Sequence, residues 1–282
     1  MKELFTNTRL KKIVNVYQLQ YTNGVAQGFG DYLRGCYCLY QICKYIDIEF
    51  DMIINHPMSK YLIIHQTPPE DISYENIDWV KGDNICEKST NFFRNFMNYI
   101  NPINQDTLYI FSNALSIWPV QSESINFIRK SIIPTDDMKN YVTQILNDIG
   151  MPFGGYSIVH IRTGDNHLLN GKRMDYKTFN KIILILKRYT SFEKKYIVLS
   201  DNNNLKNFLS QRHNRFVSYT KEITHLGENT IKTDEGIKNT LLDFFIMSRS
   251  SNIISMTPYG HGTGFSKWCA TTYGIPYICL KI

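Results

Sequence analysis

The sequence has few cysteines, no long apolar run and no block of like charge, and each absence excludes a class of protein. Its 282 residues include 6 cysteines and no CxxC pair, which excludes a zinc finger and a disulfide scaffold. No stretch reaches the roughly 18 consecutive apolar residues of a membrane span. The formal net charge is +6, but the basic residues are scattered among acids. A nucleic-acid partner is therefore not expected, whereas a small anionic ligand such as a nucleotide fits the excess.

Several catalytic and metal-binding motifs are also missing. The chain contains no DxD, no HExxH and no GxSxG, and no tight set of His, Asp and Glu appears. A metal-dependent sugar transferase of the single-Rossmann type is therefore disfavoured. We expect neither a metal ion nor a resident cofactor.

The first residues, MKELFTNTRLKKIVNVYQLQY, lack the apolar run of a signal peptide. We therefore expect a cytoplasmic protein with reduced thiols. A chain of this length makes roughly one large domain or two medium ones, at about 100–200 residues per domain. Its hydrophobic fraction of 43% excludes a disordered chain.

Strand and helix patterns alternate along the chain. The first half begins with a strand at 13–19, a glycine-rich segment at 23–35, a helix at 36–46 and a strand at 50–54. This is a βαβ beginning in which a glycine turn occupies the place of a phosphate-binding loop. Further helices are predicted at 91–100, 122–131 and 135–149, and a further strand at 107–114.

The pattern restarts after a cluster of Gly and Pro at 149–155, which predicts a domain boundary there. Predicted strands at 156–161, 196–201, 215–220, 252–256 and 276–282 alternate with helices at 176–188, 204–211, 237–250 and 264–273. Such alternation favours parallel sheets covered on both faces. We predict an α/β protein with two Rossmann-like domains, residues 1–150 and 151–282, whose parallel sheets face a cleft.

The sharpest chemical signal is the segment YSIVHIRTGD at 156–165. An apolar strand ends there in His160, Arg162 and Asp165, at the place where open α/β sheets bind ligands. Alternation puts His160 and Arg162 on one side of the strand. The arginine offers a forked, permanently charged donor that suits a diphosphate. The alternative is structural: a core histidine and an Arg162–Asp165 ion pair.

The glycine-rich segment alone is a weak signal. Gly28 and Gly30 form GxG, but Gly35 comes five residues later, so neither a GxGxxG fingerprint nor a P-loop is present. Asp51 precedes the apolar part of its strand, whereas the ribose-binding acid of a dehydrogenase would end it. The dehydrogenase interpretation is therefore disfavoured, although the glycines still permit a ligand to approach the backbone closely.

Two further segments carry polar groups that could bind a ligand: the start of the helix at 264–273 and an acid within an apolar helix. Glycines precede the helix at 264–273, and a helix N-terminus with free N–H groups can hold a phosphate. Thr263 or Ser266 can cap that helix, and plain capping is the alternative. Asp243 is a lone acid in the apolar helix TLLDFFIM. Because a buried acid is costly unless it is paired, we expect it at the helix edge or beside a donor, such as the N1–H and N2–H₂ edge of a guanine.

Together these segments resemble the GDP-fucose-dependent fucosyltransferases. HIRTGD at 160–165 is similar to the HxRxGD or HxRxTD motif of the alpha-1,6, alpha-1,2, nodulation and protein O-fucosyltransferases. GFGDYLR at 28–34 is similar to their N-terminal glycine loop. DFFIMS at 243–248, followed by GTGFS at 262–266, resembles their Asp-to-Ser-Ser-Gln region. The likeness spans most of the chain in the right order, and overall it is nearest to small fucosyltransferase-like proteins of large DNA viruses.

The resemblance implies a GT-B-like, inverting, metal-independent transferase that moves fucose from GDP-fucose to a hydroxyl of a glycan or glycoprotein. Arg162 would hold the β-phosphate, and His160 and Asp243 would contact the guanine or the ribose. The other implied donor-binding positions are Thr263, Gly264 and Phe265, which would cradle phosphates, and Gly28, Phe29, Gly30 and Arg34, which would approach the donor across the cleft.

The chain departs from the family pattern in ways that leave alternatives open. Thr263-Gly-Phe265 replaces Ser-Ser-Gln, and the motif has one arginine where several relatives have two. Inversion needs a base within reach of the acceptor hydroxyl, and Asp31, Asp165 and, more weakly, His56 are candidates. A different nucleotide-sugar donor and a non-catalytic nucleotide- or glycan-binding relative are the alternative functions.

Overall fold

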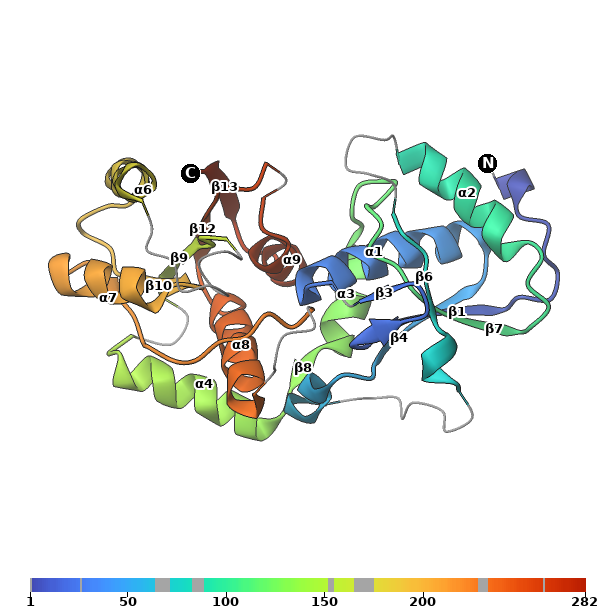
Figure 1. The fold of residues 1–282 in the computed structure, drawn as a ribbon, viewed down its shortest axis with the longest axis horizontal. Helices are drawn as coiled ribbons and strands as arrows, with labels where there is room; N and C mark the ends of the chain where they lie inside the picture. The colour runs from blue at the N-terminus through green and yellow to red at the C-terminus, as the bar shows by residue number, and fades with distance from the viewer. Residues whose placement is uncertain are drawn as a thin grey trace. The chain divides into compact units, whose positions relative to one another are not determined.

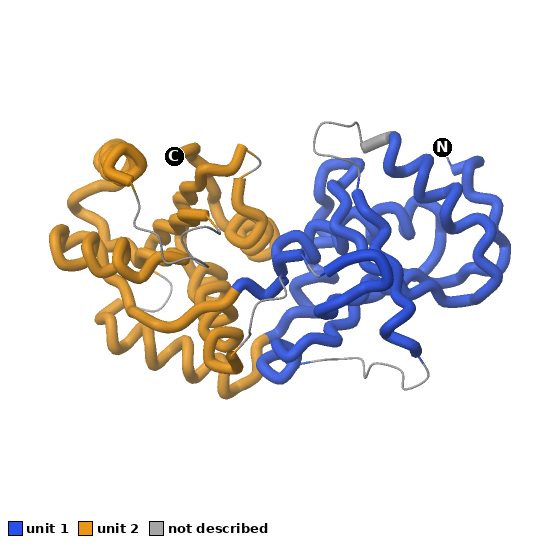
Figure 2. Tube along the Cα trace, viewed as in Figure 1, with its two compact units in different colours: residues 1–133, 225–232 blue, residues 134–224, 233–282 orange. Residues whose placement is uncertain are grey.

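The computed structural model describes residues 2–25, 27–63, 72–82, 89–151, 155–164, 175–227, 233–260 and 262–282. They divide into two compact units (Figure 2). Unit 1 is Met1–Ile133 with His225–Lys232, and unit 2 is Pro134–Thr224 with Thr233–Ile282. The predicted division after residue 150 therefore differs from the division into compact units, and the short return of the chain to unit 1 was not foreseen.

Helix α4 (Asp136–Asp148) accounts for the difference in the division. It packs against α8 (Asp234–Met247) of unit 2, and the Tyr141 hydroxyl donates a hydrogen bond to Asn239 Oδ1 at 2.8 Å. The Gly/Pro cluster at 149–155 thus follows the first helix of unit 2. A cluster of turn residues marks the end of an element and does not by itself mark the end of a domain.

Unit 1 is built on a parallel sheet with the strand order β4-β1-β7-β6 (Figure 1). The strands are β1 (Lys12–Tyr17), β4 (Glu49–Ile54), β6 (Asp78–Trp79) and β7 (Thr107–Phe111). The short elements are η1 (Lys2–Leu4), β2 (Gln20–Tyr21), β3 (Gly24–Val25), η2 (Pro57–Tyr61), β5 (Leu62–Ile63), η3 (Tyr74–Asn76) and β8 (Ile133–Pro134). The longer helices are α1 (Phe29–Ile46), α2 (Ser89–Ile100) and α3 (Ser122–Ser131).

Helix α1 begins inside the glycine-rich segment, where the sequence predicted a loop. Gly28 is its N-cap, and Gly30 and Gly35 lie within the helix. Gly35 is required by packing, because a Cβ atom there would lie 1.6 Å from the carbonyl oxygen of Ser112, just after β7. Gly35 therefore reflects the close approach of α1 to the end of β7.

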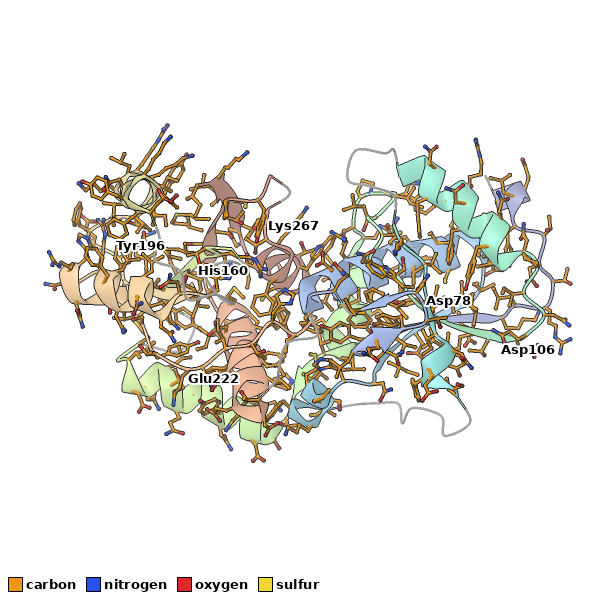
Figure 3. The ribbon with its side chains drawn as sticks, in the orientation of Figure 1. Asp78, Asp106, His160, Tyr196, Glu222 and Lys267 are labelled. Carbon is orange, nitrogen blue, oxygen red and sulfur yellow. The ribbon has the colours of Figure 1, made fainter. Side chains whose placement is uncertain are left out.

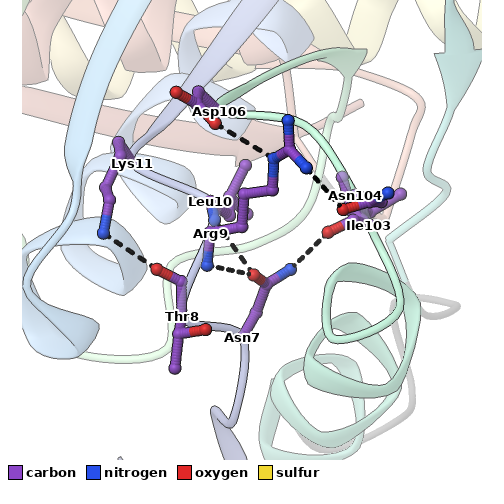
Figure 4. A network of polar contacts seen from close by, with 8 residues as sticks. All are labelled: Asn7, Thr8, Arg9, Leu10, Lys11, Ile103, Asn104 and Asp106. Atoms are coloured by element: carbon purple, nitrogen blue, oxygen red, sulfur yellow. Dashed lines mark hydrogen bonds and ion pairs between the residues drawn. The ribbon is translucent and has the colours of Figure 1, made fainter.

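The segment before β1 is held by a polar network at the edge of unit 1 (Figure 4). Asn7 Oδ1 accepts hydrogen bonds from the backbone N–H groups of Arg9 and Leu10, both at 2.9 Å, and Asn7 Nδ2 donates to Ile103 O at 2.8 Å. Arg9 also pairs with Asp106 at 3.3 Å. These bonds align the chain before β1 with the chain before β7, its neighbour in the sheet.

Unit 2 is a parallel five-stranded sheet with the order β11-β10-β9-β12-β13. The strands are β9 (Ser157–Ile161), β10 (Tyr196–Ser200), β11 (Phe216–Val217), β12 (Asn252–Thr257) and β13 (Tyr277–Lys281), and the other helices are α6 (Tyr176–Tyr189), α7 (Asn203–Arg212) and α9 (Gly264–Tyr273). Numbered within the unit, this order is 3-2-1-4-5, that of a Rossmann half. The predicted α/β architecture with two Rossmann-like parallel sheets is confirmed.

The two faces of the unit 2 sheet carry different side chains. Val159 and Ile161 of β9 join a core that includes Ile182 of α6 and Leu205 of α7. Strand alternation turns His160 to the opposite face, where α9 packs on β12 and on α8. The histidine is thus presented to the N-terminal end of α9.

No described helix combines the length and the apolar character that a membrane crossing needs. The predicted cytoplasmic location stays a prediction. Five cysteines lie in the described ranges and all are free thiols, of which only Cys279 is exposed.

Replacing Gly35 with alanine tests the packing of α1 on β7. In an open helix the change would stabilise by about 1 kcal/mol. Here we expect a loss of roughly 1–3 kcal/mol in the free energy of unfolding, because the new methyl group meets rigid backbone. Gly260→Ala is the control, since no atom lies within 4 Å of a Cβ at that position. Equal urea-unfolding midpoints for the two variants would contradict the packing account.

Candidate active site

The carboxyl ends of β9 and β12 form the centre of the candidate site. These neighbouring strands lie where the strand order of unit 2 reverses, and the connections that leave them run to opposite sides of the sheet. Open α/β sheets bind ligands at such a point. His160, labelled in Figure 3, lies at the end of β9 and pairs in register with Ser255 of β12.

Ser266, in the first turn of α9, joins the two strands to the helix. Its hydroxyl donates to Ser255 Oγ at 3.1 Å and lies 2.6 Å from Thr263 Oγ1 and 3.0 Å from His160 Nδ1. A hydroxyl has one proton, so once it donates to Ser255 it accepts from both of the others. The His160 ring then carries its proton on Nδ1, and Nε2 is the acceptor.

Burial keeps His160 neutral. The side chain is buried, and desolvation together with the nearby Arg162 charge lowers its pKa to about 3. Its ring also lies 6.2 Å from the ring of Phe265, between centroids. A neutral imidazole with an unprotonated Nε2 can accept a hydrogen bond from a ligand N–H or O–H group.

Arg162 follows β9 directly, and its backbone N–H donates to Met256 O at 2.9 Å. Its guanidinium carbon lies 5.7 Å from the centre of the Tyr259 ring, on the loop after β12. Gly164 has a φ of +108°, which favours glycine, and a Cβ there would lie 3.4 Å from the Tyr259 hydroxyl. The loops after β9 and β12 therefore meet around the arginine.

Asp201, at the end of β10, fixes the loop that carries Arg162. Its carboxylate accepts from Thr163 N at 2.7 Å, from Thr163 Oγ1 at 2.8 Å and from Gly164 N at 3.2 Å. The sequence analysis placed this residue in a strand and gave it no role. Its position at the carboxyl end of a predicted parallel strand was the available signal.

The N-terminus of α9 completes this edge of unit 2. Thr263 is the N-cap and accepts from Ser266 N at 3.3 Å, which confirms the predicted capping. Gly264 opens the helix, and the Phe265 ring packs against the ring of Phe244 at 5.5 Å. The backbone N–H groups of the first helical turn are unpaired within the helix and carry positive potential.

Asp243 has the donor partner that the sequence led us to expect, and this partner is Tyr219. The carboxylate is buried and accepts a hydrogen bond from the Tyr219 hydroxyl. Burial raises its pKa to about 6, and the Lys206 charge and the tyrosine bond partly oppose that rise. A carboxylate that is ionised above pH 6 remains an acceptor at neutral pH.

The candidates of unit 1 gather at the start of α1. Asp31 and Arg34 form an ion pair at 3.1 Å, and Arg34 Nε also donates to Asn113 O at 2.6 Å. The Phe29 side chain is buried, and its ring lies 6.0 Å from that of Tyr17. The side chain of Phe29 therefore serves the core.

Two histidines near this helix have different surroundings. His56 is buried, with Nε2 donating to Leu226 O at 3.0 Å and Nδ1 accepting from Met58 N at 3.1 Å, so both of its ring nitrogens are engaged within unit 1. His225, which the sequence analysis missed, lies beside Gly28: a Cβ on that glycine would be 3.5 Å from His225 Nε2 and 3.6 Å from Asp31 Oδ2.

Asp165, with the ion pair to Arg162 considered above, lies outside the described residues. Within the described ranges, no three His, Cys, Asp or Glu side chains come together so as to hold a metal ion. The expectation that the chain works without a metal stays a prediction.

The fold is that of GT-B glycosyltransferases of the fucosyltransferase type. No protein-family model matches the chain, and no curated protein sequence does. Solved structures do match it over nearly its full length, at sequence identities that establish similarity of fold alone.

Structures of the alpha-1,6-fucosyltransferase NodZ are among these matches. The form co-crystallised with GDP has a TM-score of 0.53 and 14% identity, covering 93% of this chain and 92% of that one. NodZ from Bradyrhizobium has a TM-score of 0.52, again at 14% identity, with the same shares covered. An arginine-to-lysine mutant of Arabidopsis thaliana FUT1 in complex with GDP has a TM-score of 0.58 and 10% identity, covering 99% of this chain and 72% of that one.

Titration of His160 tests the electrostatics of the site. The folded pKa is about 3, below the ordinary value of 6.5, so the unfolded chain takes up a proton first as the pH falls. This contribution to stability is complete above pH 6.5 and is lost as the pH falls toward 3. We expect the His160 NMR signals to stay those of a neutral ring from pH 8 to pH 4, and His160→Gln to lose this component of the pH dependence. A midpoint near 6.5 would contradict the buried geometry.

Replacing Asp201 with asparagine tests the clamp on the loop that carries Arg162. An amide cannot match three donors with a charged acceptor, so we expect a loss of about 1–3 kcal/mol in the free energy of unfolding. Asp175→Asn is the matched control, since Asp175 also accepts from a threonine N–H and hydroxyl but is exposed at the start of α6, where asparagine caps well. Equal losses in the free energy of unfolding for the two variants, measured by denaturant titration, would show that the Asp201 hydrogen bonds stabilise the protein no more than an exposed helix cap does.

Proposed function

We propose that this protein is an inverting glycosyltransferase that moves fucose from GDP-fucose to a hydroxyl of a glycan or glycoprotein, without a metal ion. The observation that carries the proposal is the place of Arg162. It follows the first strand of a Rossmann half, two residues after His160, which contacts Ser266 in the first turn of α9, in a chain with the fold of fucosyltransferases crystallised with GDP.

Arg162 and α9 together form a receptor for a diphosphate. A guanidinium group is always charged and donates in a planar fork that matches phosphate oxygens. Thr263, Gly264 and Phe265 begin a ten-residue helix whose backbone N–H groups and dipole favour an anion. Charge that develops on departing GDP would meet these fixed donors, which replace the metal ion in this role.

His160 and Asp243 are assigned to the nucleoside. His160 Nε2 and the Asp243 carboxylate are acceptors, and a guanine N1–H and N2–H₂ edge and the ribose hydroxyls are donors. An adenine presents an acceptor at N1, and a uracil has a single ring N–H. This complementarity supports a guanine nucleotide over the alternative donors.

The acceptor hydroxyl needs a base, and Asp31 is our first candidate, with Asp165 the second. The Asp31 carboxylate is half-buried and held by Arg34, which leaves Oδ2 next to Gly28 and His225. We assign Gly28, Phe29, Gly30 and Arg34 to the same side of the reaction, with the backbone of the three residues at 28–30 as the surface that approaches the sugar.

The first test is nucleotide binding. A ligand at ~100 times its dissociation constant adds about 2.7 kcal/mol of stability, which a thermal-shift titration detects. We expect stabilisation by GDP and little by UDP or ADP.

Arg162→Ala should lower donor turnover by a factor on the order of 10²–10³, and Arg162→Lys by less, because lysine keeps the charge without the fork.

Arg188→Ala is the matched control, because Arg188 also lies over a tyrosine, at 5.6 Å, on the last turn of α6. Absence of stabilisation by GDP would exclude the proposed donor. If GDP binds but GDP-fucose is neither hydrolysed nor transferred, and Arg162→Ala affects binding alone, the protein is a non-catalytic nucleotide-binding relative.

A further inference from the structure

A lysine is enclosed in unit 2 without a hydrogen-bond partner. Lys206, on α7, has 0% of its surface exposed, and no described residue accepts a hydrogen bond from its Nζ. Burying an ammonium group is costly unless opposite charge or other favourable groups surround it. The position therefore needs an explanation beyond packing.

The groups around Lys206 lead to the candidate site. Its Nζ lies 5.5 Å from the centre of the Tyr219 ring, which is within the range of a cation–π contact. The hydroxyl of the same tyrosine donates to Asp243, the acid assigned to the nucleoside. Asp201, which holds the loop of Arg162, is the second acid whose charge acts on Lys206.

The charges of this cluster influence one another. Burial lowers the pKa of Lys206, and the charges of Asp243 and Asp201 oppose that change. Burial raises the pKa of Asp243 and of Tyr219. The other titratable groups that act on Tyr219 are two tyrosines, Tyr141 of α4 and Tyr156 just before β9, neither of which carries positive charge at neutral pH. Lys206 is therefore the cation identified beside the Asp243 carboxylate within the described residues.

We propose that Lys206 is a positioning residue of the nucleotide site: its enclosed ammonium group is the counter-charge that keeps the Asp243 carboxylate ionised at neutral pH and so fit to accept hydrogen bonds. The role of Asp243 in nucleotide binding rests on the proposed function, whereas the charge coupling of the two residues does not. The charge of Lys206 also interacts with that of Asp201, which holds the loop of Arg162.

The consequence of losing Lys206 depends on pH. Without the ammonium group, the carboxyl of Asp243 would hold its proton to a pH above 6, and a protonated carboxyl is a poorer acceptor. Below about pH 5 the carboxyl of Asp243 is largely protonated with or without the lysine, so removing Lys206 should then change stability and GDP affinity little through this charge. If Lys206 only filled space, its removal would have the same effect at every pH.

The test is a double-mutant cycle between Lys206→Met and Asp243→Asn, with unfolding equilibria measured at pH 5 and pH 8. We expect weak coupling at pH 5 and at least a tenfold coupling in the unfolding equilibrium constant at pH 8, since each pH unit between two titrations is worth up to a factor of ten. Lys206→Arg should keep the wild-type pH profile. Lys206→Gln replaces Lys206→Met in the cycle if the methionine variant does not fold.

Lys238→Met is the matched control, because Lys238 also lies over a tyrosine, Tyr141, at 4.1 Å, and Lys206 is the charge identified as acting on Asp243. Its substitution should show no pH-dependent coupling to Asp243→Asn. Equal coupling at both pH values, or none at pH 8, would overturn the proposal.

A second readout is GDP affinity between pH 7 and pH 8.5. We expect wild-type affinity to be flat, and Lys206→Met to bind several-fold more weakly at pH 7 and to recover as the pH rises. An equal loss at all pH values would overturn the role of Lys206 at the nucleotide site. If wild-type protein does not bind GDP at all, the proposed function fails, and the cycle still decides whether Lys206 keeps Asp243 ionised.

Discussion

The Ser266 hydroxyl bonds to three partners at the point where the unit 2 sheet reverses its strand order. It contacts Ser255 of β12, His160 of β9 and the N-cap of α9. The connections from β9 and β12 run to opposite sides of the sheet, and His160, Ser255 and Thr263 are all buried around this hydroxyl. The single proton of Ser266 then decides which nitrogen of His160 is the acceptor, and the same contact sets the helix N-terminus beside His160.

Fixed charges and dipoles determine what this edge can bind. Arg162 and the first turn of α9 are positive, and the carboxylate of Asp201 is already engaged in holding the loop that carries Arg162. Asp243 is negative and buried, accepts a hydrogen bond from the Tyr219 hydroxyl and interacts with the charge of Lys206. A ligand that is anionic at one end and rich in N–H donors at the other matches this arrangement, and a guanine nucleotide has both properties.

Much of the fold and part of the site follow from the sequence, for physical reasons. Short apolar runs that alternate with helical patterns predicted β9, β10 and β12, and polar residues at the end of a buried strand located His160 and Arg162. Contacts between residues distant in the chain were not accessible. Position 35 must be glycine because a carbonyl after β7 lies close to it, and Asp201 accepts hydrogen bonds from two backbone amides on another loop. The role of Lys206 can be inferred only from its contact with Tyr219. Local pattern cannot distinguish a glycine needed for packing from one needed for a ligand.

The central claim is that a metal-free, arginine-centred site turns over a GDP-sugar. The most direct measurement is donor hydrolysis with GDP-fucose, GDP-mannose and UDP-sugars side by side, each with and without EDTA. The account predicts release of GDP from GDP-fucose at a rate that EDTA does not change, with little turnover of the UDP-sugars. Turnover of UDP-sugars alone, or GDP release that EDTA abolishes, would contradict it.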